Sequence, residues 1–291
     1  MLGTIVALVA VVLLVWFRRQ TFSYLTHVKG PPERHWDWTP HRPPPPVHIA
    51  AVGDAGDSGR ALNATASSVA HIARAEPYDV LLLLGDNVYP SGAVDRLPAT
   101  VFRPFAPVLG SGTDLFAILG NHDVQRSNGE AQMRALGMPG RWWSTEIGSV
   151  LLVGLDSNDL SPRQLSWLER TLAASSATWK IVALHHPPYS AGYQGSQVAV
   201  RDAVAPILRR QGVQLVLSGH DHDYQRNLPV HGVTYIVTGA GSGTRRTSTR
   251  SFTAVSFSWR SFVDVAVYPD RMVVRAVGNG NQVADQVVLR P

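Results

Sequence analysis

Short motifs rich in Asp, Asn, His and Tyr occur at five places along the chain, each directly after an apolar run. They are Gly53-Asp54-Ala55-Gly56, Gly85-Asp86-Asn87-Val88-Tyr89, Gly120-Asn121-His122-Asp123, His185-His186 and Gly219-His220-Asp221-His222. Carboxylate, amide and imidazole groups are suitable ligands for iron, zinc or manganese. A single Gly-Asp pair is ordinary turn chemistry, but five such motifs in order predict a metal site.

The composition narrows the chemistry of that site. The 291 residues include 11 His and no Cys, which excludes a disulfide framework, a thiol nucleophile and a Cys-ligated zinc. A chain that is 45% hydrophobic and 16% charged is neither disordered nor a coiled coil. Residues 1–46 hold five Lys or Arg and two Asp or Glu, so most of the net charge of +5 lies there. The remainder lacks the concentrated basic face of a nucleic-acid-binding protein, and no such binding is expected.

Alternating strands and helices must position the motifs. Short apolar runs predict buried strands at 47–52, 80–84, 115–119, 150–155, 181–184 and 213–217. Amphipathic patterns predict helices at 61–75, 125–137, 162–174 and 197–211, and Ser161-Pro162 is typical of a helix start. After residue 233 the pattern predicts a β-rich tail with strands at 233–238, 262–268, 272–277 and 283–289. Ligands of such α/β sheets bind at the carboxyl ends of the strands, where the five motifs fall.

The N-terminal residues form a different kind of segment. Residues 1–17 are almost wholly apolar and are followed by Arg18 and Arg19; as a helix they would reach roughly 25 Å, close to the thickness of a bilayer core. We interpret them as a transmembrane anchor or uncleaved signal, because a cleaved signal peptide would have a basic n-region and a small-residue cleavage site. Residues 18–46 contain seven prolines and are predicted to be a Pro-rich linker, most simply a tether. Residues 47–291 are predicted to form one domain.

The motif series resembles the calcineurin-like metallophosphoesterase superfamily over residues 47 to about 245, and more narrowly the purple acid phosphatases. Most of the superfamily begins with Asp-x-His, whose histidine is a ligand, whereas the position two after Asp54 is Gly56 here. Tyr89, three residues after Asp86, stands where purple acid phosphatases have a tyrosine ligand. The resemblance implies an α/β fold of two mixed β-sheets, packed as a sandwich and flanked by helices in four layers.

The resemblance also implies two balanced metal sites. The first metal would be held by Asp54, Tyr89 and His222, with Asp86 bridging, and the second by Asp86, Asn121, His185 and His220. A phenolate favours a trivalent ion, so the resemblance implies Fe(III) at the Tyr89 site and Fe(II), Zn or Mn at the second. His122 would face the phosphate and assist the leaving group.

One position departs from the family pattern. Nine residues after His185, where the family usually has a further histidine that assists the leaving group, this chain has Gln194. Glutamine cannot donate a proton near neutral pH, so either His122 acts alone, or His186 has a larger part, or the enzyme is slow on poor leaving groups.

Several neighbouring residues have simpler interpretations. Asp123 and Asp221 are expected to orient nearby histidines, and Trp142-Trp143 to fill the core. Arg226 and the glycine-rich segment 239–243 are candidates for substrate contact, although a plain connector is the preferred interpretation of the glycines. The histidines outside the motifs, among them His41 and His48, are expected to be structural or exposed.

The function that follows is hydrolysis of phosphate monoesters by attack of a metal-bound hydroxide, as in purple acid phosphatases. The alternatives are a phosphodiesterase or nucleotide hydrolase with Mn or Zn at both positions, and an inactive membrane-tethered binding domain. The expected partners are a small phosphate ester and, through residues 1–17, the membrane in a single pass. Which side of the membrane carries the catalytic domain is undecided: the flanking arginines favour the cytoplasmic side, and the resemblance favours the opposite side.

Overall fold

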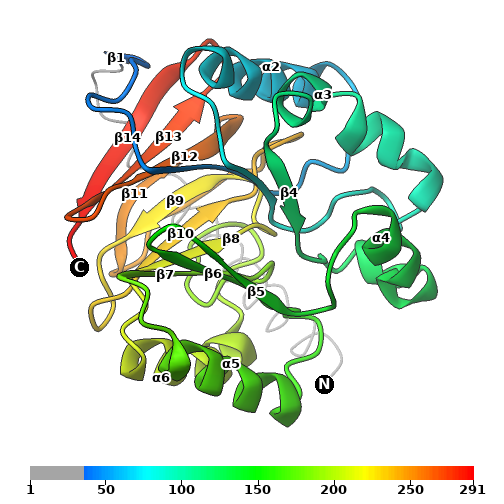
Figure 1. Cartoon of the computed structure of the whole chain (residues 1–291). Helices are drawn as coiled ribbons and strands as arrows, with labels where there is room; N and C mark the ends of the chain where they lie inside the picture. The colour runs from blue at the N-terminus through cyan, green and yellow to red at the C-terminus, as the bar shows by residue number, and fades with distance from the viewer. Residues whose placement is uncertain (1–35) are drawn as a thin grey trace, which may run out of the picture.

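One β-sheet combines strands from both ends of residues 36–291, the part of the chain that the computed structural model describes (Figure 1). Its order is β1-β14-β13-β12-β2-β3-β4. Its strands are β1 (Trp36–Asp37), β2 (Val47–Val52), β3 (Val80–Leu83), β4 (Asp114–Ala117), β12 (Ser261–Val267), β13 (Met272–Gly278) and β14 (Gln282–Leu289). β2, β3 and β4 are parallel, and β12 pairs antiparallel with β2, with Val263 opposite Ala51. The β-rich tail is therefore no separate unit, because its last three strands complete this sheet.

The second sheet is also mixed, with the order β11-β9-β10-β8-β7-β6-β5. Its strands are β5 (Trp143–Ile147), β6 (Val150–Gly154), β7 (Trp179–Ala183), β8 (Leu215–Ser218), β9 (Tyr224–Asn227), β10 (Thr234–Thr238) and β11 (Thr253–Phe257). β6, β7, β8 and β10 are parallel to one another, whereas β5, β9 and β11 pair antiparallel with their neighbours.

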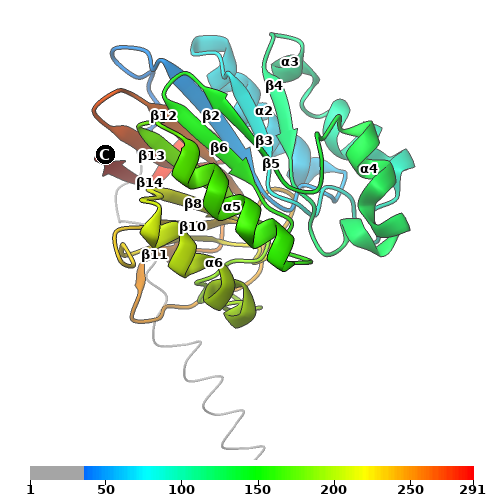
Figure 2. The same cartoon turned by 60° about the horizontal axis from the view of Figure 1, so that its bottom comes forward.

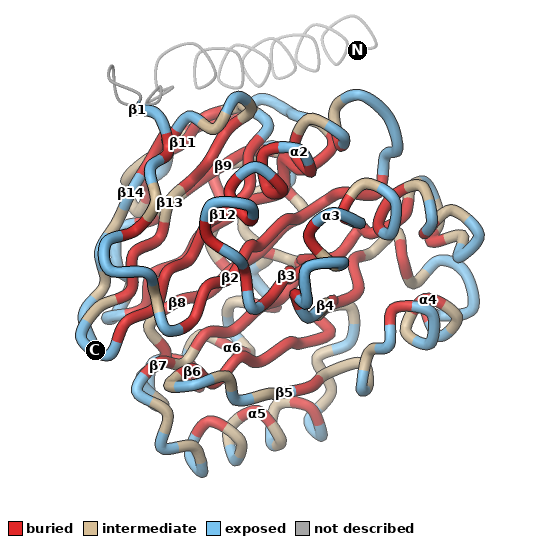
Figure 3. The backbone as a smooth tube through the Cα atoms, turned by 45° about the horizontal axis from the view of Figure 1, so that its top comes forward, coloured by how far each residue is buried: buried red, intermediate tan, exposed pale blue. Residues whose placement is uncertain are grey.

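Side chains that alternate along the strands build the layers. Ile49, Leu82, Ile181 and Leu215 belong to one buried cluster between the two sheets. The opposite faces are covered by helices: α2 (Arg60–Ala75) and α3 (Ala106–Leu109) on the first sheet, and α5 (Pro162–Ala174) and α6 (Val198–Arg210) on the second (Figure 2). The buried strands run through the middle of the molecule (Figure 3). The predicted arrangement of two mixed sheets flanked by helices is confirmed.

The local predictions hold in most places. Ser161 caps α5, its Oγ accepting from the Gln164 N–H at 3.3 Å, with Pro162 at the first helical position. The helix predicted at 125–137 shrinks to α4 (Glu130–Ala135), because Ser127 and Asn128 have positive φ angles of 48° and 52° that interrupt an α-helix.

The described end of the Pro-rich segment packs on the domain rather than hanging free. Trp36–Asp37 pairs with β14, and Trp38 and His41 are buried. The structured region thus begins upstream of residue 47. Residues 1–35, with the predicted anchor and most of the linker, lie outside the described part. Within residues 36–291 no helix is both long enough and apolar enough to cross a bilayer.

Asp264 on β12 holds this segment in place. Its fully buried carboxylate accepts hydrogen bonds from Trp38 Nε1 at 3.2 Å and Tyr78 Oη at 2.9 Å, and it contacts His41 Nε2 at 3.3 Å and His48 Nε2 at 2.6 Å. Burial alone would raise the pKa of Asp264, but the His48 charge and the histidine hydrogen bonds hold it well below its ordinary value. Burial alone would lower the pKa of His48, but Asp264 raises it. We call these five residues the Asp264 clasp.

Candidate metal centre

The five motifs follow strands of both sheets and meet at one edge of the sandwich. Asp54, the Asp86 motif and the Asn121 motif follow β2, β3 and β4, whereas the paired histidines at 185 and 186 and the His220 motif follow β7 and β8. Contacts between the sheets join these loops. The His185 Nδ1 lies 2.9 Å from the Leu84 carbonyl oxygen, and the His220 N–H donates to Asp54 Oδ2 at 2.8 Å. The centre is therefore built across the sandwich.

The donors predicted for the first metal converge. The Tyr89 hydroxyl lies 2.9 Å from Asp54 Oδ1 and 3.0 Å from His222 Nε2, and those two atoms are 3.4 Å apart. Burial and then the charges of Asp54 and Asp86 raise the pKa of Tyr89 far above its ordinary value. A phenolate at this position therefore requires a strong positive charge beside it, which a bound cation provides.

The donors predicted for the second metal form an adjoining group. Asn121 Oδ1 lies 3.1 Å from His185 Nε2 and 3.0 Å from His220 Nδ1. Asp86 Oδ1 is 3.6 Å from His185 Nε2. Because His185 Nδ1 donates to the Leu84 carbonyl, the lone pair of Nε2 is directed at Asn121 and Asp86. Donor atoms of Asp54, Asp86 and His185 all lie within 4.8 Å of one another, which places Asp86 where a bridging carboxylate would be.

Backbone strain accompanies three of these positions. Asp54, Asp86 and His220 have positive φ angles of 56°, 51° and 71°, and such conformations in non-glycine residues concentrate at functional sites. The glycines that precede these residues cannot be replaced by larger residues, because a Cβ atom would collide with its neighbours. A Cβ at Gly219 would lie 2.5 Å from Asp54 Oδ2, and one at Gly85 would lie 2.7 Å from His185 Nδ1. The glycine before each strand-end residue thus lets the loops approach closely.

Gly56 and Tyr89 are linked in the structure as well as in the motif. The Tyr89 N–H donates to the Gly56 carbonyl oxygen at 3.0 Å. A Cβ at position 56 would lie 2.7 Å from the Tyr89 nitrogen and 2.6 Å from the Asp86 carbonyl oxygen. A histidine at position 56 does not fit beside this loop. The site that holds the tyrosine therefore excludes the histidine of the usual first motif.

The buried carboxylate of Asp123 joins two of the motifs. It accepts hydrogen bonds from the backbone N–H groups of Asn87 and Val88, the Gly120 N–H, the Asn87 amide and the Gln132 amide, at 2.9–3.1 Å. Burial, helped by the Asp86 charge, raises its pKa to about 6. The prediction that Asp123 orients a histidine is wrong, because the two loops offer it five donor groups.

Asp221 has an equivalent part on the second sheet. Its Oδ1 accepts from the Gln194 N–H at 2.6 Å, and its Oδ2 accepts from the Gly195 N–H at 3.2 Å and from the Ser190 hydroxyl. Burial raises its pKa. Asp221 therefore holds the loop that carries Gln194 and does not orient a histidine as predicted.

The two candidate proton donors differ in their surroundings. His122 is about one-third exposed, its Nδ1 lies 2.6 Å from the Pro90 carbonyl oxygen, and its Nε2 lies 3.9 Å from Asp86 Oδ2 at the rim of the centre. His186 Nδ1 lies 2.9 Å from the Ser157 hydroxyl, and its ring packs on His220. Burial and then the charges of His185 and His220 lower the pKa of His186 to about 3. Near neutral pH, His186 is therefore uncharged and is a poor proton donor.

The other residues singled out in the sequence supply no further metal ligand. Trp143 is buried in the core as predicted, and Arg226 is paired with Asp285 at 2.6 and 2.9 Å, so it is not available to a substrate. Gly239 and Gly241 pack on the last and the first motif, because a Cβ at Gly239 would collide with the Asp221 carbonyl oxygen and one at Gly241 with the Gly53 carbonyl oxygen. The preferred interpretation of segment 239–243 as a connector agrees with this packing.

Two features escaped the sequence interpretation. Ser157, which contacts His186, lies outside the five motifs, and no sequence pattern around it indicated a role. The Asp264 clasp includes His41 and His48, whose partner is more than 200 residues away. Its three possible metal ligands, His41, His48 and Asp264, lie close together, but the carboxylate already has four hydrogen-bond partners within the protein.

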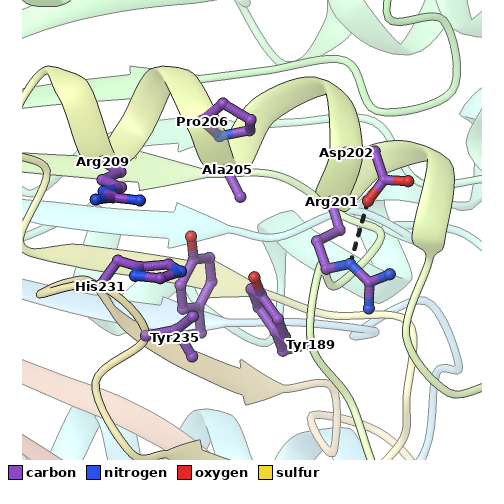
Figure 4. A pocket seen from close by; sticks show the side chains of 9 residues that line it. Tyr189, Arg201, Asp202, Ala205, Pro206, Arg209, His231 and Tyr235 are labelled. Carbon is purple, nitrogen blue, oxygen red and sulfur yellow. Dashed lines mark hydrogen bonds and ion pairs between the residues drawn. The ribbon is translucent and has the colours of Figure 1, made fainter.

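A hollow of about 220 Å³ beside α6, lined by Tyr189, Arg201 and Arg209 among others, contains none of the predicted ligands (Figure 4).

The chemistry of the donor set fits a pair of cations. One group offers carboxylate, phenol and imidazole, the other offers amide, imidazole and carboxylate, and Asp86 lies between them. Burial and then His185 lower the pKa of His220 to about 4, so its imidazole is neutral and able to bind metal. Such a set suits two ions of the iron, zinc or manganese type.

Comparison with known proteins agrees with this site. The family model described as "Calcineurin-like phosphoesterase" matches residues 47–224. Human "Tartrate-resistant acid phosphatase type 5" is 30% identical over 240 residues, covering 68% of this chain and 74% of the relative. "Purple acid phosphatase 17" of Arabidopsis thaliana is 26% identical over 226 residues, covering 64% and 67%.

Solved structures show the same fold. A purple acid phosphatase from yellow lupin superposes with a TM-score of 0.76 at 16% identity, covering 84% of this chain and 53% of the lupin chain, so this chain spans about half of that protein. The Plasmodium protein GAP50, described as "the anchor in the inner membrane complex", superposes with a TM-score of 0.74 at 18% identity, covering 84% and 88%.

The fold and the site define a metallophosphoesterase, and the chain belongs to the calcineurin-like phosphoesterase family. Within that family it is close to the purple acid phosphatases. It is a metal-dependent hydrolase of phosphoric esters, and a dinuclear metal centre is implied by these relatives.

Proposed function

We propose that this protein is an acid phosphatase that hydrolyses small phosphate monoesters, with Fe(III) held by Asp54, Tyr89 and His222. Fe(II), Zn or Mn would be held by Asn121, His185 and His220, with Asp86 bridging. The observation that carries the proposal is the coupled Gly56 and Tyr89 pair, because the loop that brings the Tyr89 hydroxyl to Asp54 and His222 leaves no room for the usual histidine. A phenolate is a hard anionic donor, which favours a trivalent ion.

The bound metals supply the activation of water and the neutralisation of phosphoryl charge. The chain's own residues orient the ester and handle the leaving-group proton. With its Nδ1–H directed at the Pro90 carbonyl, His122 presents Nε2 at the rim, where it would hold a proton for the departing oxygen. The lowered pKa of His186 argues against that role for the second candidate. Gln194 is exposed and its backbone is fixed to Asp221, so it could contact a phosphate oxygen but supplies no proton.

Metal analysis and an absorption spectrum of the purified protein test the proposal. We expect iron, a visible phenolate-to-iron band, and loss of that band in Tyr89→Phe with iron content reduced. Tyr235→Phe is the matched control, because Tyr235 lies at β10 beside Tyr189 and away from the centre. Absence of iron and of the band in the parent, with the same metal content in Tyr89→Phe, would contradict the Fe(III) assignment.

A phosphodiesterase or nucleotide hydrolase with Mn or Zn at both positions is the second proposal. It shares the donor set and differs in substrate, so parallel assays on a monoester and a diester, each with Fe, Zn or Mn added to metal-free protein, separate the two. Preference for the monoester with Fe present would support the acid phosphatase.

An inactive binding domain, the third interpretation of the sequence, disagrees with membership of this hydrolase family, although fold by itself does not imply function. The convergence of the predicted donors argues for an enzyme. Loss of hydrolysis in Asn121→Ala against an active parent would exclude a binding domain. We further propose that residues 1–17 anchor the protein in a membrane in a single pass; a protease-accessibility assay on intact cells and spheroplasts would test the anchor and show which side carries the domain.

A further inference from the structure

A second polar feature adjoins the metal centre. An open hollow of about 680 Å³ is lined by Tyr193, Thr244, Arg245 and Arg246. Tyr193 belongs to the loop between β7 and α6, and the other three belong to the loop between β10 and β11. The first of these loops also carries His185 near its start, but none of the four residues that line the hollow is a predicted metal ligand. The hollow therefore lies beside the phosphate position and not in it.

The loop between β10 and β11 is fixed directly to the His220 motif. The Arg245 N–H donates to the His222 carbonyl oxygen at 2.7 Å, and the Ser258 hydroxyl donates to the Arg245 carbonyl oxygen. A Cβ at Gly243 would lie 3.7 Å from His222 Nδ1. The backbone of Arg245 is therefore in contact with a residue predicted to hold the first metal.

The loop that carries Tyr193 is fixed to the same motif from the other side. The N–H groups of Gln194 and Gly195 donate to the Asp221 carboxylate, and Asp221 lies between His220 and His222 in the chain. Both walls of the hollow are thus anchored on two consecutive residues of the His220 motif, Asp221 and His222. A molecule whose phosphate lies on the metals would extend its remaining part past these walls.

The side chains of the hollow suit an anion. The Arg245 guanidinium carbon lies 5.4 Å from the centre of the Tyr193 ring, a cation–π distance that holds the guanidinium over the ring. Among the described residues, no Asp or Glu forms an ion pair with Arg245 or Arg246. Arg226 and Arg141, in contrast, are both neutralised by carboxylates. Arg245 and Arg246 are consecutive exposed residues without an acidic partner in the described part of the chain, and with the Thr244 hydroxyl they offer hydrogen-bond donors of the kind that bind phosphate.

Tyr193 adds an apolar surface to these charges. Its side chain is 62% exposed although both neighbouring walls are fixed, so much of its ring is open to contact by a planar or carbon-rich group. The hollow therefore combines a positive end with an exposed ring, next to a site for a first phosphate.

We propose that this hollow binds the leaving group of phosphate monoesters that carry a second phosphate, with Arg245 and Arg246 holding that second phosphate and Tyr193 packing on the carbon skeleton. The proposal rests on the proposed function, because it assigns the first phosphate to the metal centre. The three residues set specificity; they touch the substrate away from the reacting phosphorus.

The test compares two esters that differ by one phosphate, adenosine 5′-monophosphate and adenosine 3′,5′-bisphosphate, by their ratio of kcat/KM. The parent should prefer the bisphosphate, and the preference should weaken as salt rises from about 0.05 to 0.5 M because the arginines are exposed. In the double variant Arg245→Gln/Arg246→Gln, we expect that ratio to fall about 5- to 50-fold, mainly through KM. Tyr193→Ala should raise KM for both nucleotides, and Tyr193→Phe should restore the parent value.

Arg163→Gln is the matched control, since Arg163 is an exposed arginine at the start of α5, away from both loops, and it should keep the parent ratio. Hydrolysis of para-nitrophenyl phosphate is measured in every variant. A parent that hydrolyses this simple ester but shows no preference for the bisphosphate, or a double variant that keeps the preference, would overturn the specificity proposal and leave the phosphatase assignment intact. A parent inactive on all three esters would overturn both.

Discussion

The buried carboxylate of Asp123 gives the sharpest test of how the centre is positioned. In Asp123→Asn, one oxygen becomes an NH₂ group of nearly the same size. If that group replaces Oδ2, it faces the Gly120 N–H and the Asn87 side-chain N–H, which now lack an acceptor. Each buried donor left without a partner costs about 1–3 kcal/mol, so the free energy of unfolding of the variant should be lower by about 2–6 kcal/mol. A typical domain has only about 5–15 kcal/mol of stability in total.

The same change should weaken metal binding, because the Asp123 carboxylate holds the Asp86 and Asn121 loops together. Loss of such supporting groups typically lowers metal affinity about 10- to 100-fold. The assays are urea unfolding followed by tryptophan fluorescence, and metal content after dialysis against a weak chelator. Both are run at pH 7.5, above the raised pKa of Asp123 of about 6, so that the parent carboxyl is ionised.

Asp95→Asn is the control, since Asp95 is exposed and lies a few residues beyond Tyr89 on the same connection. It should match the parent in both assays. An Asp123→Asn protein with the unfolding midpoint and metal content of the parent would refute the reasoning, because it would mean that the five donors do not depend on a negative acceptor.

Three further outcomes are expected. His122→Asn should lower kcat about 10²–10⁴-fold for esters with poor leaving groups, whereas His186→Asn should keep the parent's dependence of kcat on leaving-group pKa. Gly120→Ala should lower metal content and reduce the free energy of unfolding by about 1–3 kcal/mol, because the added methyl group collides with the Asp86 carboxylate; metal analysis and urea unfolding check this. Asp264→Asn should lower the free energy of unfolding by about 3–5 kcal/mol, because it removes the buried carboxylate that Trp38, Tyr78 and the two histidines contact. The depressed pKa of Asp264 adds stability above about pH 3.9, which is lost on acidification, and the raised pKa of His48 adds stability below about pH 6.5, which is lost as pH rises. Unfolding free energy should therefore be greatest between those values in the parent, and its decline at higher pH should flatten in the variant.

The sequence predicted those parts of the molecule whose signals are local. Apolar runs marked the strands that are buried on both faces, such as β2 and β3, and the Ser161 cap fixed the start of α5. Strand β9 was missed because Tyr224–Asn227 is mostly polar, although the strand lies between β10 and β11 and Tyr224 packs in the core. Strand partners also escaped, since nothing near β2 indicates that β12 will lie beside it.

The candidate donors were found because each follows a strand in a recognisable motif, and the structure brings them together. The groups that hold them were assigned less well. Asp123 and Asp221 were expected to contact histidines, yet both bind backbone N–H groups, and loop conformation of that kind leaves no periodic signal. The hollow at Tyr193 and Arg245 was missed for the same reason, because its walls come from two irregular loops that only the fold brings together.

The pairing of β2 with β12 has a consequence for how the chain folds during synthesis. β2 is among the first strands of the described region, and its antiparallel neighbour emerges from the ribosome about two hundred residues later. Until then the backbone N–H and C=O groups on one edge of β2 have no strand partner, and His48 has no Asp264 carboxylate to contact. The segment 47–224 that carries the family signature therefore contains all of the predicted metal donors without being an autonomous folding unit. Expressed alone, it should be prone to aggregate along that open edge.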